Sequence, residues 1–435
     1  MNFEEMIDSK QLKIGVIGMG YVGLPLAVSF AEKDFSVLGF DVNVEKTERI
    51  NRGTSPISDV TSSQLTELVQ ADKIEATADM SRLAEVDMIS ICVPTPLRKS
   101  RDPDISYIAQ ATQTIVENFK PPGIVVLEST TYPGTTDEIL AEAFESAGWD
   151  LEEELLLAFS PERIDPGNPD FGMENTPKVV GGYNRKAGEL VSKLYGVVSG
   201  EIVTVSGTRV AEMVKLLENT FRSINIGLAN EMALICDRMG INVWEVIRGA
   251  ASKPFGFMPF YPGPGLGGHC IPIDPLFLSW RAKLHNTSTR FIELADEINR
   301  SMPRHVFTKI TGGLNEFERS VKGSKICVFG VAYKPDVGDT RESPAFEIIS
   351  LLLDHGAEVV YCDPYVEEFK VEGIEIQNIS PAELEGTEYD AAVIITNHSD
   401  FNWEQLLTGF NLAVDTRNAL ENGTLSGDSL KVISI

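Results

Sequence analysis

The chain has 435 residues, of which 43% are hydrophobic, so it can bury substantial cores and divide into two or three domains. Its formal net charge of -27 would repel a phosphate backbone, and its Lys and Arg residues are scattered, which argues against nucleic acid as a partner. The acidity indicates a highly soluble surface or a salty habitat.

The N-terminal segment and the cysteines restrict the class of protein further. The segment MNFEEMIDSK is polar and acidic, without the basic start and apolar core of a signal peptide. No apolar run is long enough to span a bilayer, so we expect a cytoplasmic protein with no membrane partner. The five cysteines form no CxxC pair, which disfavours a metal site or a disulfide framework. Four lie in apolar stretches that predict burial, whereas Cys270 lies in a loop rich in Gly and Pro.

The first segment predicts a strand, a helix and a second strand over residues 13–41. Further strand-like runs at 87–94, 124–130 and 154–161 are separated by helix-length segments. This alternation predicts a doubly wound parallel sheet of the Rossmann type over roughly the first 200 residues.

The turn after the first strand reads G-x-G-x-x-G, formed by Gly18, Gly20 and Gly23 around Tyr21 and Val22. Glycines at this spacing let the backbone approach a pyrophosphate at a helix N-terminus. Asp41 closes the second strand, where a carboxylate binds the adenosine ribose and repels a 2′-phosphate. The pattern therefore predicts NAD as the cofactor.

The middle of the chain, from about Gly207 to Gly240, predicts one long helix that is apolar on several faces. We expect this spine to pair subunits in a homodimer or a higher homo-oligomer, although burial within one chain would explain the pattern nearly as well. Lys215 and Asn219 are four residues apart and share a helix face. They are either a solvated surface pair or, given their apolar neighbours, a partly buried pair able to hold an oxyanion.

The loop GPGLGGHCIPIDP, residues 263–275, places Cys270 shortly before the helix start predicted at Asp274 and Pro275. A helix N-terminus lowers the pKa of a nearby thiol, which suits a nucleophile. Gly267 and Gly268 would bring backbone N–H groups near the group that the sulfur attacks. Alternatively, Asp274 only caps the helix and Cys270 is an incidental loop residue.

After about Lys322 the chain predicts a second strand, helix and strand, without a second G-x-G-x-x-G. The complete fold expected is α/β, with two Rossmann-like doubly wound domains joined by a central helical domain with a long spine helix. The expected boundaries are 1–204 for NAD binding, 205–305 for the central domain with the cysteine loop, and 320–435 for the C-terminal domain.

Together these features resemble the UDP-glucose/GDP-mannose dehydrogenase family over nearly the whole chain. The motifs that carry the resemblance are GMGYVGLPLA, VPTP at 93–96, ESTTYPGTT at 128–136, SPERIDPGN at 160–168, EMVKLLENT at 212–220, the cysteine loop, and GVAYKPDVGDTRESPA at 330–345. Within the family, the chain resembles the UDP-N-acetylglucosamine 6-dehydrogenase branch, which makes precursors of surface polysaccharides.

The resemblance implies an NAD-dependent four-electron oxidation at C6 of a UDP-sugar, through a thiohemiacetal and a thioester on sulfur. The catalytic residues it implies are Cys270, Lys215, Asn219, Asp274, Glu162 and Thr130. The implied cofactor residues are Gly18, Gly20, Tyr21, Val22, Gly23, Asp41, Lys46, Thr95 and Arg341. The implied substrate residues are Arg163, Lys215, Gly267, Gly268, Arg290 and Lys334, the last at the UDP end in the C-terminal domain.

Two departures argue against UDP-glucose as the substrate. Ile273 stands where UDP-glucose enzymes usually show a Lys, and Arg163-Ile164 stands where they show Phe-Leu. UDP-N-acetylmannosamine remains an alternative substrate. A two-electron dehydrogenase would leave the cysteine loop and the second βαβ unit unexplained, and intact Lys215, Cys270 and Asp274 argue against a silent nucleotide-sugar binding protein.

Overall fold

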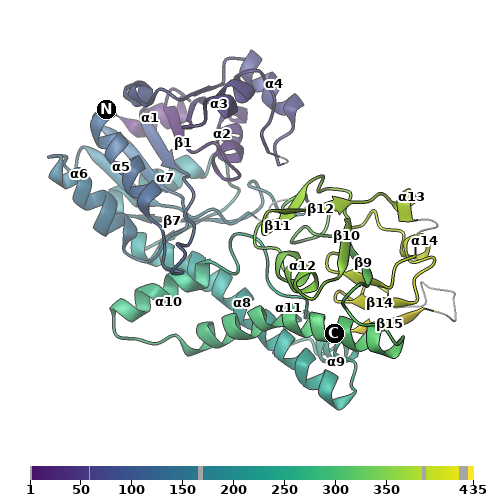
Figure 1. Cartoon of the computed structure of the whole chain (residues 1–435). Coiled ribbons are helices and arrows are strands. Elements are labelled where there is room, and N and C mark those ends of the chain that lie inside the picture. The colour runs from purple at the N-terminus through teal and green to yellow at the C-terminus, as the bar shows by residue number, and fades with distance from the viewer. Residues whose placement is uncertain (1, 58, 165–169, 385–387, 421–429) are drawn as a thin grey trace. The chain divides into compact units, whose positions relative to one another are not determined.

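A computed structural model describes residues 2–57, 59–164, 170–384, 388–420 and 430–435 (Figure 1). The chain divides into two compact units, the first comprising Met1–Glu218 with Leu276–Thr287 and the second Asn219–Pro275 with Ser288–Ile435. The division passes through helices α8 (Thr208–Met239) and α10 (Asp274–Leu284), so each contributes residues to both units.

The first unit is built on a sheet with strand order β3-β2-β1-β4-β5-β6-β7-β8. Its strands are parallel except for the antiparallel β6–β7 pair, which the sequence did not indicate. The order reverses between β1 and β4, and ligands bind at the carboxyl ends of the strands at such a reversal. The strands are β1 (Lys13–Ile17), β2 (Ser36–Phe40), β3 (Ile74–Thr77), β4 (Met88–Ile91), β5 (Gly123–Leu127), β6 (Leu155–Phe159), β7 (Lys178–Gly182) and β8 (Ile202–Val205).

Helices cover both faces of this sheet. One apolar core lies against α1, α2 and α7, and a second lies against α5 and α6, so β1 and β4 to β6 are almost wholly buried. Asn43, Thr61 and Asn184 cap three of the helices through their side chains. The helices are α1 (Phe3–Asp8), α2 (Gly23–Glu32), α3 (Val44–Asn51), α4 (Ser62–Gln70), α5 (Ser106–Asn118), α6 (Glu142–Ser146) and α7 (Arg185–Tyr195), with a 3₁₀ helix at Met80–Glu85 and a π-helical turn at Thr136–Ala141.

The second unit contains the C-terminal part of α8, helix α9 (Val243–Ala251), the cysteine loop, helix α11 (Arg290–Glu316) and a second sheet. The strand order is β11-β12-β10-β9-β13-β14-β15, parallel except for the β11–β12 pair. Its strands are β9 (Lys325–Phe329), β10 (Glu358–Cys362), β11 (Phe369–Val371), β12 (Ile374–Asn378), β13 (Ala391–Ile394), β14 (Leu412–Asp415) and β15 (Lys431–Ser434).

Helices α11 and α12 (Ala345–Asp354) pack on one face of this second sheet, and α13 (Pro381–Leu384) and α14 (Trp403–Leu406) on the other. Two Rossmann-like sheets and a long helix between them confirm the predicted fold class. Within the part of the chain that the structure describes, no helix combines the length and hydropathy needed to cross a bilayer.

Candidate active site

The glycine loop between β1 and α2 has room for a larger side chain at only one of its three glycines. Gly18 has a φ of +94°, and a Cβ there would lie 2.5 Å from the Cys92 carbonyl oxygen. A Cβ at Gly23 would lie 1.9 Å from the Gly18 carbonyl oxygen. By contrast, a Cβ at Gly20 would meet no atom within 4 Å. Gly18 and Gly23 therefore shape the turn, and Gly20 faces open space where a ligand can approach.

The N-terminus of α2 suits a pyrophosphate. Val22, at the N-cap of α2, makes no side-chain hydrogen bond to the first turn of the helix. The positive end of the helix dipole favours an anion there. Tyr21 beside it is 42% exposed, and Thr95, beyond the end of β4, is buried. The loop fits the phosphates of a dinucleotide.

Asp41 lies at the carboxyl end of β2, as expected for a ribose-binding carboxylate. Its Oδ2 accepts a hydrogen bond from the Met19 backbone N–H at 3.1 Å and pairs with Lys46 Nζ at 2.7 Å. Its Oδ1 accepts the Asn43 N–H at 3.0 Å. The structure thus brings the predicted cofactor residues Asp41 and Lys46 together and ties both to the glycine loop.

Glu162 and Lys215 are also brought together. The Lys215 Nζ donates to the Glu162 carbonyl oxygen at 2.7 Å, and Lys215 is only 9% exposed. Glu162 Oε1 accepts the N–H groups of Arg163 and Ile164 at 2.7 and 2.8 Å. Burial would raise the pKa of Glu162, but the charge of Lys178, these two N–H groups and Lys215 outweigh it and lower the pKa. Glu162 is therefore an ionised carboxylate.

A buried ion pair next to Glu162, between Lys178 and Glu128, was missed by sequence reasoning. Lys178 Nζ is 2.8 Å from Glu128 Oε2 and 3.6 Å from Glu162 Oε2, and Lys178 and Glu128 side chains are 5% and 0% exposed. Glu128 Oε1 also accepts hydrogen bonds from the hydroxyls of Tyr195 and Ser90. The available signal was a charged residue inside two apolar strand patterns, IVVLEST and KVVGG.

Arg163 is engaged within the first unit. Its Nη2 lies 2.6 Å from Glu218 Oε1, and its Nη1 donates to the Pro177 carbonyl oxygen. The rest of its motif, residues 165–168, lies outside the described residues. Thr130 is partly exposed just beyond β5, close in sequence to buried Glu128.

A second carboxylate that sequence reasoning missed is Glu212 on α8. It is fully buried and accepts the backbone N–H groups of Gly134 and Thr136 at 2.6 and 2.9 Å. Burial raises its pKa to about 7, although these hydrogen bonds oppose the shift. Glu212 joins α8 to the ESTTYPGTT segment.

Cys270 differs from the other cysteines, as predicted. It is exposed, whereas Cys92, Cys236, Cys327 and Cys362 are buried. Burial raises the pKa of the Cys92 and Cys327 thiols, and it raises that of Cys362 to about 12. These three thiols are therefore protonated and unreactive.

The cysteine loop leads into α10 with a helical turn. The helix begins at Asp274, where an N-cap was predicted, and the Cys270 carbonyl accepts the Asp274 N–H at 2.9 Å. Asp274 is 2% exposed, and its Oδ2 accepts a hydrogen bond from Asn219 Nδ2 at 2.5 Å. Asn219 is 7% exposed, so the partly buried alternative for Lys215 and Asn219 is confirmed.

The two glycines before Cys270 allow a close approach by the loop that follows β9. A Cβ at Gly267 would lie 2.7 Å from Tyr333 Cβ, and one at Gly268, whose φ is +80°, would lie 2.9 Å from the Tyr333 ring. The Gly268 N–H donates to the Arg341 carbonyl oxygen at 2.9 Å. This donor, expected to face the substrate, is instead bonded within the chain.

The remaining predicted residues of the second unit lie in the loop between β9 and α12 and at the start of α11. The Arg341 guanidinium pairs with both Asp339 carboxylate oxygens, with Nη2 2.6 Å from Oδ2. Lys334 Nζ lies 5.9 Å from the centre of the Tyr333 ring. Arg290 is exposed at the first residue of α11.

Arg417 is a further residue that the sequence did not single out. Its Nε donates to the Ile395 carbonyl oxygen at 2.7 Å, and burial lowers its pKa to about 10. Its Nη1 lies 2.6 Å from the position of a Cβ at Gly263, the first residue of the cysteine loop. Among the described residues, no group of three or more His, Cys, Asp or Glu side chains is arranged to hold a metal ion.

Three family models match the chain in order. They describe the NAD binding domain, the central domain and the UDP binding domain of the UDP-glucose/GDP-mannose dehydrogenase family, at residues 12–199, 209–301 and 327–422. With the two sheets and the dinucleotide loop, they define an NAD-dependent nucleotide-sugar dehydrogenase. The chain belongs to the UDP-glucose/GDP-mannose dehydrogenase family.

Relatives of two substrate types are similar to it. A UDP-N-acetyl-D-mannosamine dehydrogenase of Pyrococcus horikoshii is 35% identical over 94% of this chain and 96% of its own length. A UDP-N-acetyl-D-glucosamine 6-dehydrogenase of Pseudomonas aeruginosa is 32% identical over 90% of this chain and 92% of its own.

Solved structures show the same fold. The UDP-D-ManNAc dehydrogenase of P. horikoshii has a TM-score of 0.89 and 33% identity, and the match covers 98% of this chain and 99% of that one. A UDP-glucose dehydrogenase of Pyrobaculum islandicum has a TM-score of 0.82 and 26% identity, with coverage of 97% and 98%.

Proposed function

We propose that the chain oxidises the C6 hydroxyl of UDP-N-acetylglucosamine to the uronic acid through a covalent Cys270 intermediate. The observation that carries the proposal is the single exposed thiol in a loop that Asp274 and Asn219 join to α8. The family membership supplies the substrate class, a UDP-sugar, and the cofactor, NAD.

In this proposal the reaction proceeds in two oxidations and a hydrolysis. The C6 hydroxyl first loses a hydride and a proton, which gives an aldehyde. The Cys270 thiolate adds to the aldehyde carbon, and loss of a second hydride from the thiohemiacetal gives a thioester. Water then cleaves the C–S bond, which releases the acid and restores the thiol. NAD, when bound, accepts one hydride in each oxidation.

The resemblance to the family implies the roles of the side chains. Lys215 and Asn219 hold the charge that develops on the reacting oxygen, because an ammonium and an amide are the donors suited to an oxyanion. Asp274 acts as base or orients water, and Glu162 assists thioester hydrolysis, with Thr130 at the same site. The lowered pKa of Glu162 supports its role, since a base must be unprotonated to accept a proton from water.

In this proposal the predicted domains bind different parts of the cofactor and the substrate. Residues 1–204 hold NAD at the glycine loop, Asp41, Lys46 and Thr95, and the resemblance implies Arg341 as a further cofactor residue. Residues 320–435 hold the UDP end through Lys334. Arg163, Gly267 and Arg290 contact the sugar, as the resemblance implies. Nucleotide sugars and NAD are cytoplasmic metabolites, so we propose a cytoplasmic role in making a surface-polysaccharide precursor.

UDP-N-acetylmannosamine is the second candidate substrate. The P. horikoshii UDP-N-acetyl-D-mannosamine dehydrogenase is similar to the chain both in sequence and, as a solved structure, with a TM-score of 0.89. The two sugars differ in configuration at one carbon, away from the oxidised C6. The Cys270 chemistry is therefore the same for both.

A substrate panel separates the candidates. Purified protein is incubated with NAD and UDP-N-acetylglucosamine, UDP-N-acetylmannosamine or UDP-glucose, and the uronic acid is measured by mass spectrometry. We expect the highest kcat/KM with UDP-N-acetylglucosamine. A higher value with the mannosamine epimer would select the second candidate, and acid formation only from UDP-glucose would contradict both.

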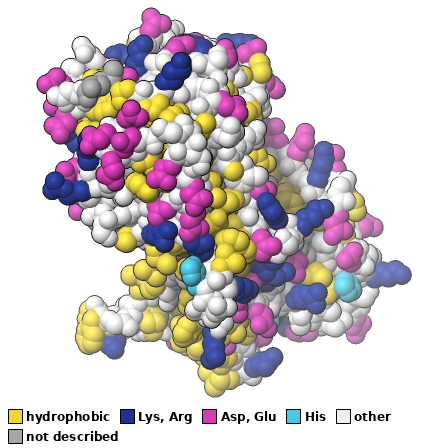
Figure 2. All heavy atoms as spheres, turned by 90° about the vertical axis from the view of Figure 1, so that its left-hand side faces the viewer, with side chains coloured by type: hydrophobic (Ala, Val, Ile, Leu, Met, Phe, Trp, Pro, Cys, Tyr) yellow, Lys and Arg dark blue, Asp and Glu magenta, His cyan; other side chains and the backbone are white. Residues whose placement is uncertain are grey.

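We further propose that the chain forms a homodimer through α8. Phe221, Leu228 and Ile235 recur every seven residues on this helix and are 46%, 54% and 43% exposed. Apolar side chains at this spacing form a stripe that suits packing against another helix. Packing within one chain therefore leaves part of α8 exposed. In Figure 2, apolar side chains (yellow) also gather at the lower end of the face.

Light scattering after size exclusion tests this interface. Leu228→Arg is expected to shift the protein from dimer to monomer, whereas Ile374→Arg, at a 54% exposed position on β12, is expected to remain dimeric. A wild-type monomer at micromolar concentration would contradict the dimer.

A further inference from the structure

The cysteine loop rests on a loop of the C-terminal sheet. Residues 330–344 connect β9 to α12. Tyr333 in this segment lies close to the backbone of Gly267 and Gly268. The Arg341 carbonyl accepts the Gly268 N–H at 2.9 Å. Because Gly268 is two residues before Cys270, the position of the thiol depends on what holds the 330–344 loop in place.

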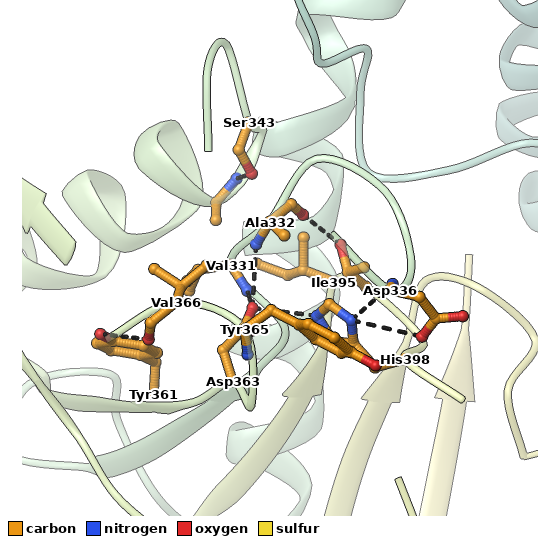
Figure 3. Close-up of polar contacts among 12 residues, drawn as sticks. Val331, Ala332, Asp336, Ser343, Tyr361, Asp363, Tyr365, Val366, Ile395 and His398 are labelled. Atoms are coloured by element: carbon orange, nitrogen blue, oxygen red, sulfur yellow. Dashed lines mark hydrogen bonds and ion pairs between the residues drawn. The ribbon is translucent and has the colours of Figure 1, made fainter. Parts of the chain in front are cut away.

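His398, just beyond β13, holds the middle of this loop (Figure 3). Its side chain is fully buried, and its Nδ1 accepts the backbone N–H of Asp336 at 3.0 Å. Its Nε2 lies 3.1 Å from Asp363 Oδ2. Since a backbone N–H can only donate, Nδ1 carries no proton, and the ring proton is on Nε2 facing Asp363.

Asp363 fixes the start of the same loop. Its Oδ2 accepts the N–H groups of Val331 and Ala332 at 2.8 and 3.1 Å as well as the histidine proton (Figure 3). Burial would raise the pKa of Asp363, but the hydrogen bond from His398 and the backbone donors lower it. Oδ2 thus accepts three donors, and Oδ1 accepts the Tyr365 N–H at 2.9 Å.

The side chain of Asp336 also helps to hold the 330–344 loop in place. Its Oδ1 accepts the N–H and the hydroxyl of Ser399 at 2.8 and 3.0 Å. The Tyr365 ring covers the imidazole, with ring centres 4.9 Å apart. The 330–344 loop is therefore fastened at 331–332 through Asp363 and at 336 through His398.

We propose that His398 is a positioning residue for Cys270. The imidazole acts through the Asp336 backbone, the 330–344 loop and Tyr333, which together place the cysteine loop. The kinetic part of this proposal rests on the proposed function of Cys270, whereas its structural part does not. His398 is only 1% exposed.

Two amide variants, each matching one ring nitrogen, separate the two nitrogen contacts. In His398→Asn, the amide oxygen takes the place of Nδ1 and can accept the Asp336 N–H. In His398→Gln, the amide nitrogen takes the place of Nε2 and can donate to Asp363, but the acceptor for Asp336 is lost. His355→Gln is the matched control, because His355 is exposed at the end of α12.

Hydrogen exchange by mass spectrometry gives the first readout. Peptides covering 263–275 are expected to exchange about tenfold faster in His398→Gln, because release of the loop frees the Gly268 N–H. His398→Asn and His355→Gln are expected to exchange like the wild type. Equal exchange in His398→Gln and wild type, or an equal increase in His398→Asn and His398→Gln, would overturn the proposal.

Steady-state kinetics give the second readout. We expect kcat to fall about tenfold or more in His398→Gln, because small displacements of a reacting group are costly, and to recover in His398→Asn. Unaltered kcat in His398→Gln with faster exchange would refute the link to Cys270. If no UDP-sugar is oxidised by the wild type, the proposed function fails, and hydrogen exchange still decides the anchoring role.

Discussion

Lys178 opens an apolar strand, yet its ammonium is almost completely removed from water. Such burial is costly unless the charge is paired and the remaining polar atoms are hydrogen-bonded. Glu128 provides the pairing, and Tyr195 and Ser90 complete its shell. The pair lies next to Glu162, so it also sets the electrostatic environment of that carboxylate.

We expect Lys178→Met to destabilise the protein by about 3–5 kcal/mol, because it leaves Glu128 buried without its cation. Urea unfolding measures this loss. Adding Glu128→Gln to Lys178→Met is expected to recover much of it, since the uncompensated charge is then gone. If the double variant were as unstable as the single one, the cost would come from packing and not from charge.

Among single residues, sequence reasoning singled out those that lie in a loop or are separated by a helical spacing. The spacing of Lys215 and Asn219 and the Gly/Pro setting of Cys270 were visible in the chain. Glu128, Lys178 and Glu212 were missed because each stands among apolar residues and finds its partner in a distant segment. Only the fold shows that those partners meet.

The turn from β1 into α2 shows how one element combines fold and function. Two of its glycines are required by the backbone, and the third is not, because a Cβ at Gly20 would meet no atom within 4 Å. A side chain at Gly20 would therefore occupy the space proposed for the cofactor, without disturbing the protein.

Gly20→Ala is expected to change the free energy of unfolding by less than about 1 kcal/mol and to raise the KM for NAD. Gly18→Ala is the contrasting variant, because its φ of +94° and its 2.5 Å approach to Cys92 predict a clear loss of stability. Thermal unfolding and NAD titration of both variants make the comparison. A Gly20→Ala protein with unchanged KM for NAD would contradict the cofactor assignment.

The contact between α8 and the turn at Thr136–Ala141 depends on pH through Glu212. The pKa of Glu212 is raised from 4.5 to about 7 in the folded protein, so the folded state binds this proton more tightly than the unfolded state. Its contribution to stability is complete below pH 4.5 and is lost as the pH rises to 7.

We expect Glu212 to make the free energy of unfolding fall by about 3 kcal/mol between pH 4.5 and 7.5. Glu212→Gln, which mimics the protonated form, is expected to remove this part of the pH dependence. The measurement is urea unfolding of both proteins at several pH values. Parallel curves for wild type and variant would show that Glu212 does not titrate in this range.

Elements were predictable where local pattern determines them. The βαβ units and the limits of α8 followed from apolar periodicity and from glycines at its ends. The antiparallel direction of β7 did not, because a buried strand has the same pattern in either direction. Helix α10 starts at Asp274 because the Cys270 carbonyl already accepts a helical hydrogen bond from it.

For the molecule as a whole, the residues proposed for the chemistry come from both units. Glu162, Lys215 and the glycine loop belong to the first, and Asn219, Asp274 and Cys270 belong to the second. Lys215 and Asn219 are one turn apart on α8, which is therefore the element that links the two sets. The sequence indicated this link through a spacing of four residues on one helix.

The substrate is the part that sequence and fold leave to experiment. Relatives named for the glucosamine and the mannosamine sugars are 32% and 35% identical to the chain. Epimers differ in the direction of one substituent, and few side chains contact it. Whole-chain similarity at this level therefore reports the reaction class and not the configuration of the sugar.

The most direct test of the account is the ratio of NADH formed to UDP-sugar consumed. If Cys270 captures the aldehyde as a thiohemiacetal, wild-type protein with excess NAD forms about two NADH for each uronic acid released. Cys270→Ser is expected to stall before the acid is released. One NADH per sugar in the wild type, or an unchanged ratio and rate in Cys270→Ser, would contradict covalent catalysis at this thiol.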